Sequence, residues 1–285
     1  MVQETSTCVI SICSLNHADV WKLTSTLLPK HIDASTYKVY VPDMQMEEFK
    51  KITNPKILIL PQSILAEKFI APLASAVAYS GNMSRFGWYY QQFLKFEALN
   101  QAREQRLVIW DADCVPMAPI KLFSNSGQPI YMRATEFHAE YFNMIERLLR
   151  IKRVVDTSFV IPGFPITKNW YEELISDIET INNMPWYDAI IKNTNFQLTS
   201  GFSETEVMGT WVSNVHSGEI GYSNFNWERL GQSKIGYAKD LNADTVERIG
   251  KRRNIQIVSF ENWDVKRRLI KKLGSRISQA KLKNG

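Results

Sequence analysis

The first part of the chain alternates short apolar, β-branched runs with segments of helical apolar spacing. The runs typical of buried strands are Thr7–Cys13, Tyr37–Val41 and Lys56–Leu60. Helical spacing extends from about Ala18 to Leu28, and from Asp43, which caps the second helix, to about Lys51. Strands separated by helices need crossover connections, so this alternation predicts a mixed α/β fold with a mostly parallel sheet flanked by helices.

Later segments continue the alternation less regularly. Further strands are expected at Leu107–Trp110, Pro129–Arg133, Ser158–Ile161 and Ile255–Phe260. Further helices are expected at Gly87–Ala102, His138–Lys152, Thr167–Ile181, Trp186–Lys192 and Ser203–Val212. Residues 64–84 are small and mixed and are expected to end in a mobile loop, and residues 162–165 (PGFP) predict a rigid turn.

The composition allows a large core and excludes several classes of protein. With 285 residues, 45% of them hydrophobic, the chain suits one large α/β domain or a domain with an appended piece. It has no GxGxxG after the first strand and no GxxxxGKS/T, which disfavours dinucleotide oxidoreductases and P-loop enzymes. Three cysteines without a CxxC pair, a polar N-terminus and the lack of about 18 consecutive apolar residues favour a reduced, cytoplasmic protein.

The strongest chemical signal lies where the run Leu107–Trp110 ends. Two carboxylates, Asp111 and Asp113, follow this strand one residue apart, and Pro116 stops the segment. Carboxylates are costly to bury without a partner, and ligands of open α/β sheets bind outside the carboxyl ends of the strands. The pair therefore suits a hard divalent cation, which in turn suits phosphate oxygens.

A second group of acids follows much later in the chain. Ser203 and Glu206 have the spacing of a capping box, and Glu204 lies in the first helical turn, where the helix dipole favours an anion. Both acids therefore have a structural explanation, although a carboxylate here could also serve as a general base. Arg85 and Lys95, ahead of the acid pair, either belong to a solvated face or point at a bound anion.

These features together resemble a known family. A hydrophobic strand ending in Asp111-Ala112-Asp113 resembles the DxD motif of GT-A glycosyltransferases, which use nucleotide sugars. From the first strand to about Val215, the chain is similar to DUF6492, a group of bacterial glycosyltransferase-like proteins. The three blocks that carry this similarity are Gly87–Gln92 with Lys95, the acid pair, and Ser203–Glu206 before Gly209. The resemblance implies one GT-A (Rossmann-like) domain over residues 1–262, with a nucleotide-sugar half to about 133 and an acceptor half from about 134.

The resemblance also implies roles for individual residues. Asp113 would bind a divalent metal, Mn²⁺ or Mg²⁺, directly, and Asp111 would contact the ribose or reach the metal through water. Glu204 would deprotonate the acceptor hydroxyl. Glu206 is the second candidate for this role, because its capping role already explains its presence. His216 would be a further metal ligand, although a lone histidine is more often a surface residue. The donor-binding residues would be Ser14, Asp19, Arg85, Gln92, Lys95 and Asp111.

The expected partners are a nucleotide sugar and a glycan or lipid-linked acceptor of surface polysaccharide or lipopolysaccharide synthesis. Residues 263–285 predict a basic amphipathic helix. Such a helix is either a solvated terminal helix or one attracted to anionic phospholipid by about 1 kcal/mol for each basic residue near the surface. The second interpretation predicts a cytoplasmic protein at the inner face of the membrane. No recognised nucleic-acid motif accompanies the charge, so nucleic acid is not expected as a partner.

Two other interpretations compete with the transferase. Residues 111–115 also fit the DxDxT/V motif of haloacid-dehalogenase-type phosphatases, in which Asp111 would be a covalent nucleophile. That motif normally ends the first strand of its domain, whereas about three strands precede it here. The paired acids such an enzyme needs for magnesium are also absent after Val155, where Asp188 and Asp240 stand alone. A non-catalytic sugar-binding module would keep the fold without needing both Asp111 and Asp113.

Overall fold

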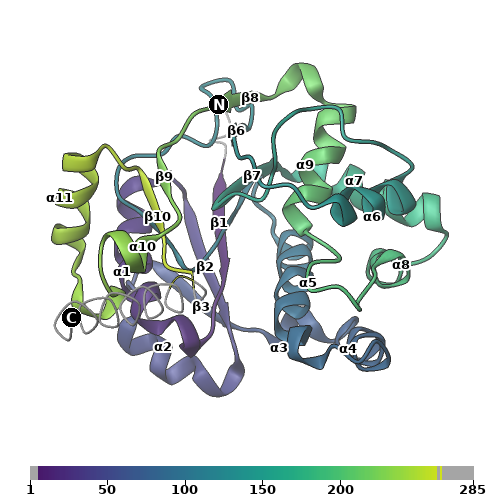
Figure 1. Cartoon of the computed structure of the whole chain (residues 1–285), viewed down its shortest axis with the longest axis horizontal. Coiled ribbons are helices and arrows are strands. Elements are labelled where there is room, and N and C mark those ends of the chain that lie inside the picture. Colours follow the sequence, from purple (N-terminus) through teal and green to yellow (C-terminus); the bar gives the residue numbers. More distant parts are fainter. Residues whose placement is uncertain (1–5, 262–263, 265–285) are drawn as a thin grey trace, which may run out of the picture.

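A five-stranded sheet forms the centre of the molecule (Figure 1). The computed structural model describes residues 6–261 and Asp264. The strands are β1 (Thr7–Ile12), β2 (Thr36–Val41), β3 (Ile57–Pro61), β4 (Arg106–Trp110) and β7 (Gly163–Thr167). Their order is β3-β2-β1-β4-β7, and the pairings are parallel except that of β7 with β4, which is antiparallel. The prediction of a mixed α/β fold with a mostly parallel sheet flanked by helices is confirmed.

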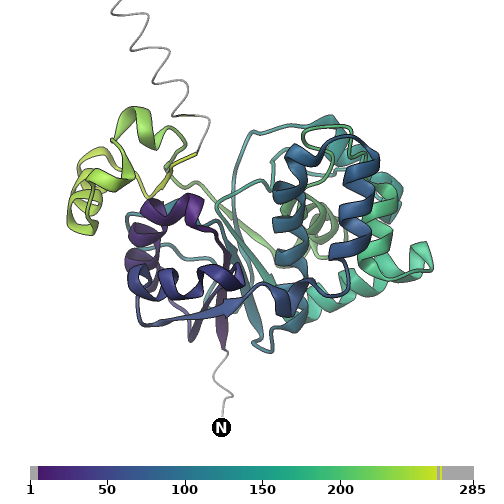
Figure 2. The same ribbon diagram turned by 90° about the horizontal axis from the view of Figure 1, so that it is seen from below.

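Helices cover both faces of this sheet (Figure 1, Figure 2). One face carries α1 (Ala18–His31) and α2 (Met46–Ile52), and the other carries α5 (Phe86–Gln101). Beyond α5 on that side lie α3 (Ser63–Ala66), α4 (Ile70–Tyr79), α6 (Ala139–Leu149), α7 (Lys168–Asn182), α8 (Trp186–Asn193) and α9 (Glu204–Val215). The helical spacing of Tyr89, Phe93 and Phe96 on α5 predicts a core-facing stripe, and all three side chains are fully buried.

Residues 227–261, here called the C-terminal unit, pack beside α1 (Figure 1). The unit contains β9 (Trp227–Glu228), α10 (Gly231–Lys234), α11 (Ala243–Arg253) and β10 (Ile257–Ser259). β10 pairs in parallel with β9 and antiparallel with β5 (Cys114–Pro116), which directly follows the acid pair. Lys30 and His31 of α1 both bind Glu247 of α11, at 2.6 and 2.7 Å. The last described strand is therefore attached to the segment that bears the acids.

Short elements complete the chain. β6 (Ile130–Met132) and β8 (Gly221–Ser223) form a parallel pair. The 3₁₀ helices are η1 (Leu15–His17), η2 (Asp43–Gln45), η3 (Met83–Arg85), η4 (Ser217–Glu219) and η5 (Ala238–Asp240).

The expected rigid turn at residues 162–165 is wrong, because this segment forms most of β7. Pro165 is tolerated since β7 is an edge strand, where a missing N–H can face away from the ladder. Gly163 is required because a Cβ there would lie 2.6 Å from the ring of Trp110. The strand expected at Ser158–Ile161 is also wrong: Ser158 makes only an isolated bridge to Ala134.

Residues 64–84, which were expected to end in a mobile loop, contain helices that the sequence analysis did not predict. They contain most of α3, all of α4 and the first part of η3. Its last residues are anchored, because Ser80 Oγ and Asn82 Nδ2 donate to the carbonyl of Phe196 at 3.3 and 2.9 Å. Alanine-rich composition hid a helix whose buried residues are Leu73 and Val77.

In the part of the chain that the structure describes, no helix is both long and apolar enough to cross a membrane. The basic helix expected over residues 263–285 lies outside the described residues, apart from Asp264. The Asp264 carboxylate accepts a hydrogen bond from the Ser233 amide at 2.9 Å.

Candidate active site

The acid pair occupies a tightly held turn at the carboxyl end of β4. The amide of Asp111 donates to the carbonyl of Pro162 at 2.9 Å, just before β7. Thr24 Oγ1 of α1 donates to the carbonyl of Ala112 at 3.1 Å. The amide of Phe260 donates to the carbonyl of Asp113 at 2.9 Å. Three separate parts of the chain thus fix the backbone from which both carboxylates project.

Lys95 connects the two acidic groups that are far apart in the sequence. Its Nζ lies 2.7 Å from Asp111 Oδ1 and 2.5 Å from Glu204 Oε1. The side chains of Lys95 and Glu204 are only 7% and 6% exposed, whereas that of Asp111 is 35% exposed. The three residues therefore form a chain of charges from the solvent-accessible end of β4 into the protein, with Lys95 in the middle.

The charges of this group affect one another. Burial lowers the pKa of Lys95, but the carboxylates of Asp111 and Glu204 outweigh it and hold the pKa above its ordinary value, so the ammonium stays charged. Burial raises the pKa of Asp113, and the neighbouring Asp111 raises it further, while His17 opposes this shift. Two acids crowded in one partly buried turn create a place where a cation is favourable.

The first turn of α9 places Glu204 beside Lys95. Ser203 is the N-cap, and its Oγ accepts a hydrogen bond from the amide of Glu206 at 3.3 Å. Gln92 of α5 accepts one from the amide of Glu204 at 3.0 Å through Oε1. Gln92 therefore acts from a second helix as an additional cap, and it fixes where α9 begins relative to Lys95. Among the described residues its Nε2 is buried without a hydrogen-bond partner.

Glu206 is turned away from Lys95. Its Oε2 accepts hydrogen bonds from Ser158 Oγ at 2.9 Å and from the amide of Phe159 at 3.0 Å. Burial raises the pKa of Glu206, and these two hydrogen bonds only partly offset the effect. Of the two acids predicted as catalytic, Glu204 joins the acid pair and Glu206 holds the segment that precedes β7.

The structure does not bring His216 to the acid pair. His216 directly follows α9, at the opposite end of the helix from Glu204, and a twelve-residue helix is about 18 Å long. Its ring nitrogens lie 3.0 Å from Glu173 and 3.1 Å from Glu219, and the ring stacks on Trp170 with centroids 4.3 Å apart. The position of His216 gives no support to its prediction as a metal ligand.

The remaining predicted donor-binding residues lie near the carboxyl ends of the strands. Ser14 follows β1 and is half-buried, and Asp19 is exposed in the first turn of α1. Arg85 Nε donates to the carbonyl of Thr199 at 2.8 Å, and its guanidinium lies 4.5 Å from the centre of the Trp88 ring. Arg85 therefore links the segment before α9 to the start of α5.

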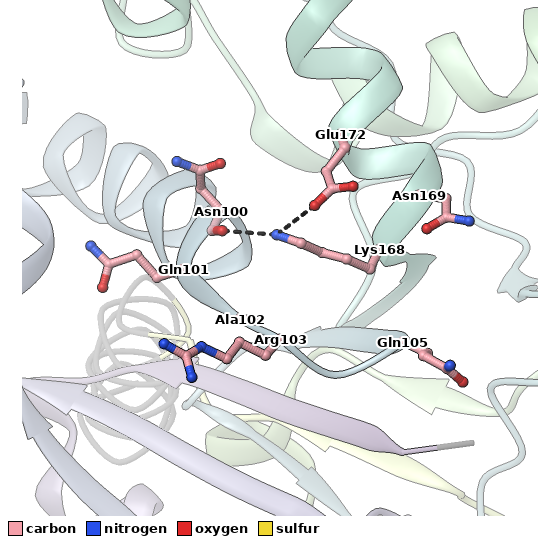
Figure 3. Close-up of a pocket in the computed structure, with 8 residues that line it drawn as sticks. All are labelled: Asn100, Gln101, Ala102, Arg103, Gln105, Lys168, Asn169 and Glu172. Carbon is pink, nitrogen blue, oxygen red and sulfur yellow. Dashed lines mark hydrogen bonds and ion pairs between the residues drawn. The ribbon is translucent and has the colours of Figure 1, made fainter. Parts of the chain in front are cut away.

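One cavity is remote from these residues. It measures about 560 Å³ and is lined by residues such as Gln105, Arg103 and Lys168 (Figure 3). Lys168 Nζ donates to the carbonyl of Asn100 at 2.8 Å and lies 3.5 Å from Glu172, contacts that close the end of α5. Because Arg106 begins β4 and pairs with the last residue of β7, this cavity lies at the opposite end of the sheet from Asp111. A second cavity of about 120 Å³ adjoins Asp19.

The acid pair fits a divalent cation whose other ligands come from substrate and water. Within the described part of the chain, no group of three or more His, Cys, Asp or Glu side chains is arranged to hold a metal. Mg²⁺ is commonly bound by one or two carboxylates together with substrate phosphates. Asp111 and Asp113 supply that number of carboxylates, and the half-buried turn leaves both side chains partly accessible.

The fold and the site define a mixed α/β protein with its polar residues gathered at the carboxyl ends of parallel strands. The chain belongs to DUF6492, described as a family of unknown function, whose sequence model matches residues 18–214. The predicted family is thus confirmed. No curated protein matches the chain in sequence.

Two solved structures of glycosyltransferases resemble this one at low identity. Apo mouse xyloside xylosyltransferase 1 is 12% identical, with 90% of this chain and 98% of that chain covered and a TM-score of 0.49. The apo WbbM bifunctional glycosyltransferase is 11% identical, with 92% and 47% covered and a TM-score of 0.42. At these values neither likeness assigns an activity.

Sequence reasoning missed the residues that face the loop after β1 from the C-terminal unit. These include Tyr237, Lys239 and Phe260, which line the 120 Å³ cavity together with His17 and Asp19. Asn242 could have revealed part of the unit, since it caps α11 by accepting from the amide of Thr245 at 2.9 Å. Nothing in the local sequence of Lys239 indicates that it lies near β1.

Proposed function

We propose that this protein is a metal-dependent glycosyltransferase that moves a sugar from a nucleotide-sugar donor to a glycan or glycolipid acceptor. The observation that carries the proposal is the Lys95 bridge between Asp111 and Glu204. It unites a candidate diphosphate site and a candidate general base in one charged group at the carboxyl end of β4. The DxD-like acid pair at the end of β4 supports the same conclusion.

The donor side of the reaction needs positive charge. Breaking the bond between the sugar and a nucleoside diphosphate leaves negative charge on the diphosphate, and a divalent cation held by Asp113 and Asp111 would supply Lewis-acid stabilisation there. Lys95 neutralises Asp111 from the protein side and fixes the direction of its carboxylate. This arrangement suits a donor whose diphosphate approaches from the exposed side of Asp111.

The acceptor side needs a base. In an inverting transfer one carboxylate takes the proton of the attacking hydroxyl, and Glu204 is the residue assigned to that role. Lys95 and the Gln92 contact to its amide hold Glu204 in place. Glu206 is left out of the chemistry because both hydrogen bonds to its Oε2 come from residues 158 and 159.

The acceptor proposed is a glycan or lipid-linked glycan of surface polysaccharide or lipopolysaccharide synthesis. The basic residues 263–285 are proposed to attract the protein to anionic phospholipid at the cytoplasmic face of the membrane. Liposome sedimentation of the full chain at low and high salt tests this part separately.

Donor binding tests the proposal most directly. Thermal unfolding is measured with a panel of nucleoside diphosphates and nucleotide sugars, with and without Mn²⁺. Stabilisation by at least one diphosphate, dependent on Mn²⁺ and lost in Asp113→Asn, is expected. Stabilisation by beryllofluoride alone would instead favour a phosphatase with Asp111 as nucleophile and would refute the transferase.

Catalysis is tested by sugar transfer, or by slow hydrolysis of the stabilising nucleotide sugar when the acceptor is not at hand. Glu204→Gln should lower the rate by about 10²–10⁴-fold, as expected for loss of a general base, without weakening the binding of the diphosphate. Glu219→Gln, at an exposed acid near the far end of α9, is the matched control. A Glu204→Gln protein that transfers sugar at the wild-type rate would remove Glu204 from the mechanism.

A further inference from the structure

The 120 Å³ cavity lies between the loop after β1 and the C-terminal unit. One wall carries Asn16, His17 and Asp19, and the other carries Tyr237, Lys239 and Phe260. The second wall lies outside the segment matched by the family model, which ends at residue 214. Whatever binds here is therefore recognised in part by a region that family membership does not describe.

Two residues of this cavity are connected to the acid pair. Phe260 donates its amide to the carbonyl of Asp113 at 2.9 Å. His17 lies in the loop after β1, and β1 is the parallel neighbour of β4, which ends at the acid pair. The cavity therefore adjoins the acid pair.

The groups around the cavity suit a phosphate. Its walls offer the exposed ammonium of Lys239 and the side-chain amide of Asn16, both able to donate to phosphate oxygens. Asp19 at the same site is an acceptor and suits the hydroxyls of a ribose.

We propose that this cavity binds a phosphate group of the donor nucleotide and that Lys239 is the cation that holds it. This inference rests on the proposed function and adds to it a residue of the C-terminal unit. The ammonium of Lys239 would then add positive charge to that of the cation that Asp111 and Asp113 would hold. The donor would be held from the parallel sheet on one side and from the C-terminal unit on the other.

The test compares Lys239→Met with Lys239→Arg and with Lys251→Met. Lys251 is an exposed lysine of α11 outside the cavity and serves as the matched control. Isothermal titration with Mn²⁺ measures the Kd of the stabilising nucleoside diphosphate and of the corresponding nucleoside. Lys239→Met should weaken the binding of the diphosphate about tenfold or more, because a charge-assisted hydrogen bond is lost. Lys239→Arg and Lys251→Met should bind it nearly as wild type does.

The nucleoside decides which part of the donor Lys239 contacts. Its affinity should be the same in Lys239→Met and in wild type, and an equal loss for nucleoside and diphosphate would overturn the assignment to phosphate. Unchanged diphosphate affinity in Lys239→Met would overturn the inference while leaving the transferase intact. If wild type binds no nucleoside diphosphate with Mn²⁺, the proposed function itself fails. Lys239 is exposed, so thermal unfolding of the variant should match wild type and verify its fold.

Discussion

Replacing Lys95 by Met should destabilise the protein strongly, because it leaves Glu204 as an unpaired charge in the interior. The Glu204 side chain is 6% exposed and loses a partner at 2.5 Å. Removing one member of a buried ion pair typically costs about 3–5 kcal/mol. The lower end, about 3 kcal/mol, is expected here, since the 35% exposed Asp111 can be solvated instead.

The expected change is large enough to measure by thermal unfolding. At about 2.1 cal/mol/K of unfolding entropy per residue, a chain of 285 residues loses about 1.7 °C for each kcal/mol, so Lys95→Met should unfold about 5 °C below wild type. The double variant Lys95→Met/Glu204→Gln should recover most of this loss, because it removes the stranded charge together with its partner. Lys95→Met/Asp111→Asn should recover less.

The two double variants separate the effect of charge on stability from the effect of packing. If Lys95→Met/Glu204→Gln is as unstable as Lys95→Met, the cost comes from packing rather than from charge, and the account of Lys95 is wrong. None of these variants should retain sugar transfer, since each lacks part of the candidate site.

Two other predictions concern regions away from the site. Burial lowers the pKa of His31 below its ordinary 6.5 despite Glu247, so the unfolded chain takes up the proton first. The free energy of unfolding should therefore fall as the pH drops below about 6.5, less steeply in His31→Gln, as urea denaturation at a series of pH values can show. A Cβ at Gly209 would lie 2.0 Å from the ring of Phe159, so Gly209→Ala should cost about 1–3 kcal/mol. Gly218 has open space around it, so Gly218→Ala should leave the thermal unfolding temperature nearly unchanged. If Gly218→Ala lowers this temperature as much as Gly209→Ala does, the packing argument is wrong.

Strands β1 and β4 could be predicted because their sequences suit burial on both faces. β1 is buried along its whole length, and the apolar run of residues 107–110 in β4 is buried too. β7 could not be predicted in the same way, since its Gly163 and Pro165 are typical of turns. Only the tertiary structure explains them: the Trp110 ring excludes a side chain at 163, and the edge position tolerates a proline at 165.

The candidate site, too, could be predicted only in part from the sequence. Asp111 and Asp113 stand out because acids at the end of a buried run are unusual in any sequence. The capping pattern of Ser203 correctly indicated where α9 begins, and hence that Glu204 lies in its first turn. The pairing of Lys95 with Glu204 depends on the crossing of two helices, which no local pattern contains. From periodicity alone, Lys95 could be either a solvated residue or one that binds an anion. Only the fold shows that it is buried between two acids.

The bond from Phe260 to Asp113 has a consequence for the order in which the protein is made. A ribosome synthesises residues 111–113 long before residues 257–260, yet the strand that clamps the acid-bearing turn is the last one described. During most of translation the nascent chain therefore carries both acids on a turn that lacks this support. Completion of the acid-bearing turn should be a late step of biosynthesis, coupled to the emergence of the C-terminal unit from the ribosome.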